Sequence, residues 1–476
     1  MKNLIWFRQD LRISDHAALW HATQQAECIA YVALSPAQWR IHDDAAIKID
    51  FYLRQLQQLK QQLHQLNIPL IVQVIPFWKD IAQPLLELCK QFDIQQIHAN
   101  LEFGVHEQQR DQCFKDILKS TQITFYLHQD RTLFPVGHIR NQSGQPYKVF
   151  SAFKHNCYQR LDIQIPACFP DITPQIPLNL DIEPSQSTIP ALADLGYIAP
   201  TLDIQHLWPV GEDFAKKQLN EFIEQDVVHY QQQRDFPALS ATSQLAAYLN
   251  IGILSIRQCL QTLFQAQHGQ FLIQNQGQRC WLDELLWREF YQHILFDFPQ
   301  VSKHQLFQTK TRQLVWRENE TDLKAWQHGQ TGIPIVDAGM RQLMQTGWIH
   351  NRVRMICAMF LSKNLLIDWR KGEQWFMQHL IDGDLAANNG GWQWCASTGT
   401  DAVPYFRIFN PIEQSKKFDP NGDYLRKWLP ELRHLDAKTI HAPYATSEQP
   451  HLDYPEPIVD LKASRLRALD AFKSLS

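Results

Sequence analysis

The sequence predicts two structural classes in one chain: an N-terminal α/β region with a parallel, Rossmann-like sheet, and an all-α C-terminal region. Strand and helix patterns alternate over the first 130 residues, prolines gather between 166 and 200, and helical periodicity dominates from about residue 210. Strands that alternate with helices imply βαβ units and a parallel sheet. We therefore expect an α/β domain at 1–130, a connecting segment at 131–209 and a helical domain at 210–476.

Short apolar runs bounded by polar residues predict five strands in the N-terminal region. They lie at 3–7, 28–34, 70–75, 94–101 and 123–127. Amphipathic patterns predict helices at 47–66 and 77–92 between them. No GxGxxG follows the first strand, so the dinucleotide fingerprint is missing, although ligands of such sheets usually bind beyond the carboxyl ends of the strands.

Residues 129–209 contain many prolines and few periodic runs, which indicates a long surface connection rather than a domain. After it, apolar residues recur at helical spacing and strand patterns largely vanish. The predicted helices lie at 213–232, 254–267, 281–296, 335–346, 351–367, 372–381 and 459–475.

Composition limits the classes of partner. The chain has 476 residues, 20% of them charged, and a net charge of −4, so any binding of nucleic acid must use a local basic patch. Nine dispersed cysteines without a CxxC pair predict reduced thiols in the cytoplasm and no metal site. The N-terminus lacks the apolar core of a signal peptide, and no apolar run is long enough to span a membrane.

The run from Ile381 to Asp401, IDGDLAANNGGWQWCASTGTD, is the most informative part of the chain. Its two asparagines and two glycines at 388–391 disfavour a helix interior, so we expect a site wall that allows close approach of the backbone. Trp392 and Trp394 offer large aromatic faces for stacking or for electron transfer, and packing in a core is the alternative.

Two other segments carry polar residues at suggestive spacings. Thr242 and Ser243 precede a helical pattern, where hydroxyls and free backbone N–H groups can cradle a phosphate or simply cap the helix. In WLDELLWREFY, a helix would place Glu284, Trp287 and Arg288 on one face, either as a site or as an ordinary amphipathic helix.

A basic zone stands out within the acidic chain. WIHNRVRM brings Asn351, Arg352, Arg354 and Met355 together, and further cations lie nearby in the sequence at Arg341, Lys363, Arg370 and Lys371. Arginine suits bidentate contact with phosphate, which favours a nucleic-acid surface, although a solvated helix face is the alternative.

Five segments in one order carry a resemblance to a known family. They are WFRQDLRISDH (6–16), YQQQRDFP (230–237), WLDELLWREFY (281–291), TGIPIVDAGMRQLMQTGWIHNRVRM (331–355) and LIDWRKGEQWF (366–376). Together with the run at 381–401, they resemble the DNA photolyase–cryptochrome family, and most closely the bacterial cyclobutane pyrimidine dimer photolyases with a folate antenna. The resemblance implies an N-terminal antenna domain and a helical domain that binds FAD as FADH⁻.

The resemblance assigns roles to particular residues of this sequence. The implied FAD contacts are Tyr230, Thr242, Ser243, Gln244, Leu245, Ala246, Trp281, Arg354, Asp382, Gly383, Asp384 and Asn388. The residues implied at the dimer are Glu284, Trp287, Asn351, Met355 and Trp394. Asn388 is the photolyase-like residue beside the reactive flavin nitrogen, and it favours the fully reduced anionic flavin.

Three further sets follow from the same resemblance. The electron relay would be Trp392, Trp369 and Trp316, and the DNA contacts would be Arg234, Arg288, Arg352, Arg407 and Gln414. The antenna 5,10-methenyltetrahydrofolate would meet His42, His106, Glu107 and Lys303. His106 departs from the family, where asparagine is usual, and a deazaflavin or no antenna remains open.

The implied function is light-driven repair of cyclobutane pyrimidine dimers in DNA by a cytoplasmic monomer. Three alternatives stay open. A cryptochrome-type photoreceptor would usually have a long C-terminal extension and a different residue at Asn388. A (6-4) photolyase would need histidine chemistry where Asn351 and Met355 stand. A flavin enzyme unrelated to DNA would not need Arg234, Arg352 and Arg407.

Overall fold

The computed structural model describes residues 2–24, 26–444 and 452–475, and the chain forms two compact units. The first unit comprises Met1–Val228 and Ser243–Ser302, and the second comprises His229–Thr242 and Lys303–Ser476. Each unit is thus assembled from two stretches of chain. The functional domain boundaries at 1–130, 131–209 and 210–476 stay a prediction.

A five-stranded parallel sheet forms the centre of the first unit, as predicted. Its strand order is β3-β2-β1-β4-β5, with β1 (Lys2–Phe7), β2 (Glu27–Leu34), β3 (Leu70–Val74), β4 (Ile94–Asn100) and β5 (Thr124–His128). β1 lies in the middle, with Leu4 opposite Ile29 on one side and Ile97 on the other. The inner strands are apolar on both faces because helices cover both sides of the sheet.

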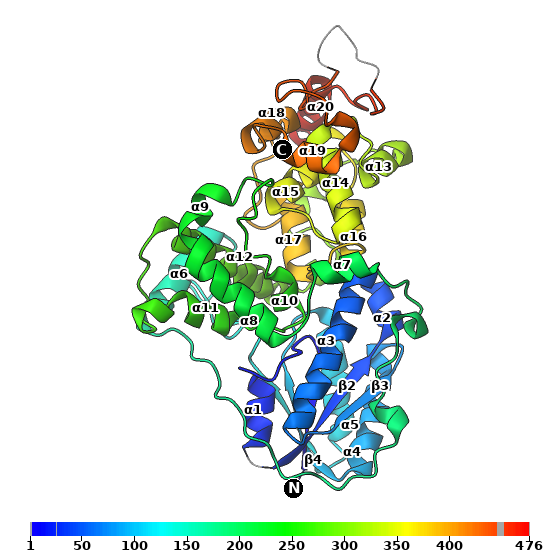
Figure 1. Ribbon diagram of the computed structural model, residues 1–476, viewed down its shortest axis with the longest axis vertical. Coiled ribbons are helices and arrows are strands. Elements are labelled where there is room, and N and C mark those ends of the chain that lie inside the picture. Colours follow the sequence, from blue (N-terminus) through cyan, green and yellow to red (C-terminus); the bar gives the residue numbers. More distant parts are fainter. Residues whose placement is uncertain (1, 25, 445–451, 476) are drawn as a thin grey trace. The chain divides into compact units, whose positions relative to one another are not determined.

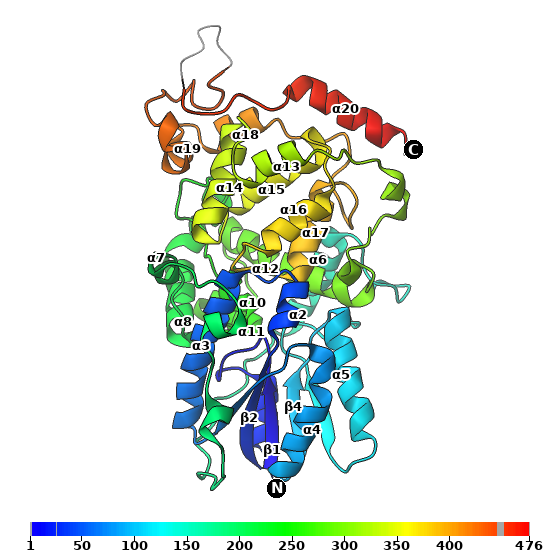
Figure 2. The ribbon, with the colours of Figure 1, turned by 90° about the vertical axis from the view of Figure 1, so that its right-hand side faces the viewer.

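The covering helices follow from the direction of the crossovers. The chain moves from β1 to β3 through α1 (Ala17–Thr23), α2 (Pro36–Ile41) and α3 (Ala46–Gln65), and then returns to β4 through α4 (Ala82–Gln91) and to β5 through α5 (Val105–Leu118). Since such crossovers are right-handed, the reversal places α4 and α5 on the face opposite α3 (Figure 2). The strand order therefore reverses between β1 and β4.

Helices complete the first unit after the sheet. They are α6 (Phe150–Ile163), α7 (Leu202–Leu207), α8 (Glu212–Glu221), α10 (Ala246–Asn250), α11 (Ile256–Leu263) and α12 (Gln276–Asp297). α6 lies inside the segment that we predicted as a connection. It buries Phe150, Phe153, Cys157 and Leu161, which recur at helical spacing on one side.

Among the residues that the structure describes, the second unit contains helices and no strands (Figure 1). Its helices are α9 (Tyr230–Gln233), α13 (Glu320–Gln327), α14 (Pro334–Thr346), α15 (Asn351–Met359), α16 (Trp369–Met377), α17 (Leu385–Cys395), α18 (Pro411–Phe418), α19 (Asp423–Trp428) and α20 (Leu461–Lys473). The predicted helix at 351–367 is shorter, because α15 passes into a π-helical segment at Phe360–Asn364. One apolar core joins α14 to α17 and contains Trp326, Trp369 and Trp392.

One local prediction was wrong. Residues 388–391 are not an irregular wall but lie inside α17. The amide of buried Asn389 donates to Glu373 Oε1 at 2.8 Å and accepts from Gln393 Nε2 at 2.8 Å, so it does not compete for the backbone. Contacts with α16 thereby override the low helix propensity of the run.

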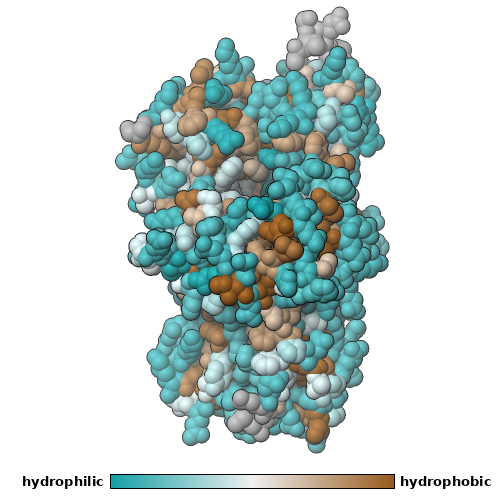
Figure 3. Space-filling view, turned by 90° about the vertical axis from the view of Figure 1, so that its left-hand side faces the viewer, coloured by the Kyte–Doolittle hydropathy of each residue, from teal (hydrophilic) through white to brown (hydrophobic). Residues whose placement is uncertain are grey.

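All nine cysteines are free. Among the described residues, no helix is long and apolar enough to cross a membrane, and the face drawn in Figure 3 is largely hydrophilic with scattered apolar side chains. The same residues contain no group of three or more side chains that could hold a metal ion.

Candidate functional site

The predicted site residues fall into both units, and each unit gathers its own set. The first unit holds Ser243, Gln244, Leu245, Ala246, Trp281, Glu284, Trp287, Arg288, His42, His106 and Glu107. The second unit holds Tyr230, Arg234, Thr242, Lys303, Trp316, Asn351, Arg352, Arg354, Met355, Trp369, Asp382, Gly383, Asp384, Asn388, Trp392, Trp394, Arg407 and Gln414.

A cavity of about 360 Å³ in the second unit brings five predicted residues together. Met355 comes from α15 and Trp394 from α17, so an apolar wall and an aromatic face border the same space. Arg352, Arg407 and Gln414 add two cations and an amide to the lining. The space matches small-molecule sites in size and combines apolar surface with a few polar groups.

Four lining residues were not predicted: Asp235, Phe409, Lys417 and Phe418. Asp235 follows Arg234 in the motif YQQQRDFP, and Lys417 and Phe418 end α18. The guanidinium carbon of Arg352 lies 4.5 Å from the ring centre of Phe418, and the ammonium of Lys417 lies 5.0 Å from it. Only the proximity of these segments in the fold reveals them, because α18 and Asp235 are far apart in the chain.

The start of α15 is held by a neutral histidine. His350 caps the helix, and its Nδ1 accepts the backbone N–H of Arg352 at 3.2 Å. Burial, with Arg354 and Arg352 nearby, lowers the pKa of His350 to about 4. The ring is therefore uncharged at neutral pH, which keeps Nδ1 available as an acceptor, while Asn351 at the first turn is exposed.

An ion pair joins α15 to the segment before α17. Arg354 Nη2 donates to both carboxylate oxygens of Asp382, at 3.0 and 2.7 Å, and its Nε donates to the Ile349 carbonyl at 2.7 Å. The Asp382 side chain is 4% exposed and that of Arg354 23% exposed. The pair presents a fixed donor and a fixed acceptor side by side, as the alternating carbonyls and ring nitrogens of a flavin require.

Asp384 and Asn388 are also fixed by the fold. Asp384 is the N-cap of α17, and its Oδ1 accepts from Ala387 N at 2.9 Å. Asn388 Nδ2 donates to the Glu373 carbonyl at 3.0 Å, which sets the plane of its amide. Because the amide nitrogen is engaged in this way, the side-chain oxygen of Asn388 is a hydrogen-bond acceptor with a fixed orientation. These donor and acceptor groups fit a flavin.

The tryptophans of the predicted relay share one core. Trp392 and Trp369 are 2% and 0% exposed, and Trp316 is partly buried against the same cluster. Trp392 packs edge-on against Phe376 at 5.0 Å and Trp326 at 5.9 Å between ring centres. A Cβ on Gly372 would lie 2.1 Å from the Trp392 ring, so only glycine allows this position.

In the first unit, α12 carries the predicted aromatic pair and acid, and its helical form is confirmed. Trp281 is buried, and its Nε1 donates to Ser243 Oγ at 3.4 Å. The ring of Trp287 stacks on Phe150 with centres 3.6 Å apart and planes 12° apart. Phe150, on α6, was not predicted, because nothing in the sequence links α6 to α12.

Thr242 and Ser243 do not cap a helix. The N-cap of α10 is Leu245, no side chain accepts from its first turn, and the preceding Gln244 has a φ of 50°. The left-handed residue turns the chain between the hydroxyls and the helix. Their predicted contact with a phosphate stays a prediction, although the helix N-terminus that suggested it does not form at these two residues.

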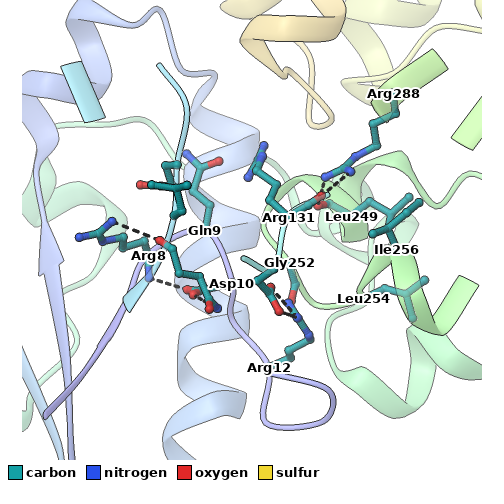
Figure 4. Close-up of a pocket in the computed structure, with 14 residues that line it drawn as sticks. Arg8, Gln9, Asp10, Arg12, Arg131, Leu249, Gly252, Leu254, Ile256 and Arg288 are labelled. Carbon is teal, nitrogen blue, oxygen red and sulfur yellow. Dashed lines mark hydrogen bonds and ion pairs between the residues drawn. The ribbon is translucent and has the colours of Figure 1, made fainter. Parts of the chain in front are cut away.

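The crevice where the strand order reverses is small. It has a volume of about 20 Å³ and is lined by residues at or after the ends of β1, β4 and β5, together with Leu249, Gly252, Leu254, Ile256 and Arg288. Figure 4 shows Arg12 directed at Gly252, whose carbonyl it meets at 3.1 Å. Arg288 donates to the carbonyls of Arg131 at 2.9 Å and Leu249 at 3.5 Å, so its predicted contact with DNA would require it to exchange these bonds.

Three predicted antenna residues gather in the first unit. His42 Nε2 lies 2.8 Å from His106 Nδ1, and the two rings lie edge to edge with planes 7° apart. Trp78 packs edge-on against His42 at 4.8 Å. Burial, with Glu102 nearby, raises the pKa of Glu107 to about 7.

Comparison with known proteins gives consistent matches over nearly the whole chain. Residues 3–171 match the DNA photolyase family, and residues 281–474 match the FAD binding domain of DNA photolyase. The chain is 43% identical to the deoxyribodipyrimidine photo-lyase of Salmonella typhimurium, with 99% of this chain and 98% of that protein covered.

Two solved structures show the same fold. A bacterial class III photolyase from Agrobacterium tumefaciens matches with a TM-score of 0.84 and 33% identity, over 100% of this chain and 97% of that one. A cryptochrome from Synechocystis sp. matches with a TM-score of 0.85 and 27% identity, over 99% of each chain.

Proposed function

The chain belongs to the DNA photolyase family, and from this premise we propose that it is a light-dependent enzyme that splits cyclobutane pyrimidine dimers in DNA. The observation that carries the proposal is the second-unit cavity, where an aromatic face and an apolar wall stand beside two arginines. A photoreceptor without a nucleic-acid substrate would not need this combination.

The cavity suits a pyrimidine pair that has left the duplex. Trp394 supplies a face for stacking, and Met355 supplies a pliable apolar wall. A dimer distorts its own base pairing, so extruding it costs less than extruding a normal pair. Arg234, Arg288, Arg352, Arg407 and Gln414 are the proposed contacts to the DNA backbone.

Glu284 and Asn351 are the proposed hydrogen-bonding partners of the dimer, and Trp287 its second stacking face. The ring of Trp287 can hold one orientation because Phe150 covers its other side at 3.6 Å. Hydrogen bonds from fixed groups in a pocket that excludes water stabilise charge that develops on the pyrimidines.

The cofactor is FAD. Bound in its reduced form and excited by light, FAD would lend the electron that opens the cyclobutane ring and would regain it afterwards, so that the repair leaves no net change of oxidation state. The proposed contacts are Tyr230, Thr242, Ser243, Gln244, Leu245, Ala246, Trp281, Arg354, Asp382, Gly383, Asp384 and Asn388. Among them, Arg354 and Asp382 hold each other in place and orient donor and acceptor groups, and Asn388 presents a fixed amide.

We further propose Trp392, Trp369 and Trp316 as an electron relay, and His42, His106, Glu107 and Lys303 as the site of a methenyltetrahydrofolate antenna. The relay is supported by the shared core of its three rings. The antenna is supported by the paired imidazoles and by the raised pKa of Glu107, which allows that carboxyl group to donate a hydrogen bond near neutral pH. A cytoplasmic monomer stays our expectation.

The deciding experiment is repair of a thymine-dimer oligonucleotide by dithionite-reduced protein, under blue light and in the dark. We expect thymine to be restored only in the light. A protein that holds photoreducible flavin and repairs nothing would instead be a photoreceptor, the second candidate, which the likeness to the Synechocystis cryptochrome favours. Repair of a (6-4) lesion alone would move the assignment to that class.

Replacement of Trp316 by phenylalanine tests the relay. We expect Trp316→Phe to block light-driven reduction of the oxidised flavin, because the chain of rings then ends before the surface. Repair by protein that has been reduced chemically should persist. A dark-reduced variant that also fails to repair would contradict the assignment of Trp316.

A further inference from the structure

One acid faces the cations of the second-unit cavity. Asp235 Oδ2 accepts from Arg352 Nη2 at 2.7 Å, and the two side chains are 33% and 19% exposed. The guanidinium of Arg352 also lies over the ring of Phe418 at 4.5 Å. Arg352 is therefore held on two sides within the cavity wall, in an orientation that the protein itself fixes.

The charges around this pair make Asp235 distinctive. Among the described residues that line the cavity, Asp235 is the one carboxylate, beside Arg352, Arg407 and Lys417. Arg234 lies 3.9 Å from the same carboxylate. An arginine that is paired with a carboxylate cannot give both of its outer nitrogens to a phosphate, so a DNA phosphate has to displace Asp235 before it gains a bidentate contact.

We propose that Asp235 competes with DNA phosphate for Arg352 and thereby lowers the affinity of the protein for DNA. The inference rests on the proposed function and adds a residue that controls how tightly the same surface binds DNA. Undamaged DNA binds through its phosphates alone, so loss of the Asp235–Arg352 pair makes its binding weak. A flipped dimer loses the same pair but also fills the cavity beside Met355 and Trp394, and its stacking makes up for the loss.

The test replaces the carboxylate and measures binding of two otherwise identical duplexes, one undamaged and one with a single thymine dimer. For Asp235→Asn we expect binding of the undamaged duplex to tighten about threefold to tenfold, and its salt dependence to steepen by about one unit in slope. Binding of the dimer duplex should tighten by a similar factor, because both duplexes displace the same acid.

Asp423→Asn is the matched control. Asp423 is an exposed acid of the same unit that faces Arg426 at 3.7 Å, so its replacement makes the same change in net charge away from the cavity. Equal tightening by this control would overturn the proposal, because the effect would then be general electrostatics. Unchanged binding of either duplex by Asp235→Asn would overturn it as well. Asp235→Ser, with a smaller side chain, should behave as Asp235→Asn does, and both thermal midpoints are measured to show that the variants fold.

A double-mutant cycle with Arg352 isolates the mechanism. On an Arg352→Gln background, Asp235→Asn should change binding of undamaged DNA by less than about twofold, because the competitor has lost its target. A full effect on that background would overturn the role of Arg352. The unsubstituted protein is assayed for light-dependent repair in the same preparations, so a failure of the proposed function is seen separately from a failure of this inference.

Discussion

Two arginine-rich regions of this molecule have opposite designs. In the first unit, Arg12 lines the crevice of about 20 Å³ at the strand-order reversal, and it shares a buried acid with Arg257. Arg12 and Arg257 both donate to Asp130 at 2.6 Å, and these three side chains are at most 7% exposed. In the second unit, Arg352 has one acid partner that is one-third exposed, and Arg407 is exposed at the edge of a cavity of about 360 Å³.

The difference shows how burial decides the role of an arginine. A fully buried guanidinium has to keep its acid, because a lone charge in the interior is very unfavourable. A partly exposed guanidinium keeps water as an alternative partner and can exchange its acid for a ligand. The buried arginine–acid pairs beside the first-unit crevice therefore stabilise the fold, even though sheets of this type usually bind ligands at this position. The second-unit cavity can take a substrate.

The largest expected effect is a loss of folding stability when the buried acid Asp130 is replaced. Asp130→Asn removes the shared partner of Arg12 and Arg257 and leaves two buried cations with less compensation. The substitution should destabilise the first unit by about 3–5 kcal/mol, which corresponds to a fall in thermal midpoint on the order of 10 °C. Differential scanning calorimetry of the whole chain measures it.

Asp283→Asn provides the control within the same unit. Asp283 pairs with Lys154 at 2.9 Å, but the two side chains are 22% and 30% exposed. Its loss should therefore cost about 1 kcal/mol or less. Similar costs for Asp130→Asn and Asp283→Asn would show that burial does not set the value of these pairs, and the contrast between the two regions would then fail.

An intermediate effect is expected at the cavity, on binding rather than on stability. Among the residues that the structure describes, no carboxylate pairs with Arg407, so its charge is available to a phosphate. Arg407→Gln should weaken binding of dimer-containing DNA by about 1–3 kcal/mol and reduce the salt slope by about one, at an unchanged thermal midpoint. Fluorescence anisotropy at several salt concentrations gives both quantities.

Arg465→Gln, at an exposed position of α20, makes the same change in net charge for comparison. It should leave the affinity within about twofold of the unsubstituted protein. A loss of stability in Arg407→Gln, or an equal loss of affinity in Arg465→Gln, would remove the distinction between a binding arginine and a structural one.

The fold could be predicted well from the sequence where one pattern decides the local structure. The five strands lie within a residue or two of their predicted bounds, because apolar runs between helices have few alternatives. α6 was missed, since prolines on both sides of it obscured the helical spacing of Phe150, Phe153 and Leu161. Residues 388–391 became helical because Glu373 and Gln393 satisfy the amide of Asn389, a contact that local propensity cannot reveal.

Many residues that line the cavity could be predicted from the sequence, but the contacts between them could not. Met355, Trp394 and Arg407 came from separate motifs, and the structure places them around one cavity. Asp235 stood beside a predicted residue in the same motif and was passed over, because an acid next to an arginine in sequence gives no sign of a partner elsewhere. Phe150 and Phe418 were missed for the same reason, since aromatic residues are usual in cores.

The smallest expected effect is a loss of folding stability at low pH, and DNA binding should not change with it. In the first unit, His98 Nδ1 lies 2.9 Å from His128 Nε2, and His21 stacks on His128. Burial, with the neighbouring imidazoles, lowers the pKa of His98 to about 4 and that of His128 to about 3. The unfolded chain takes up these protons near pH 6.5, before the folded chain does, so stability is present above that pH and is lost as the pH falls toward 4 and 3.

Between pH 7.5 and pH 5, this difference should cost about 1–2 kcal/mol after screening of the partly exposed ring is allowed for. The double substitution His98→Gln and His128→Gln should remove that part of the acid sensitivity, and His64→Gln, on the exposed side of α3, should not. Thermal midpoints at the two pH values measure the change. Because neither ring lines the second-unit cavity, binding of dimer-containing DNA at pH 7.5 should stay the same. If the double variant loses as much stability at pH 5 as the unsubstituted protein does, the His98–His128 pair does not cause the acid sensitivity of the first unit.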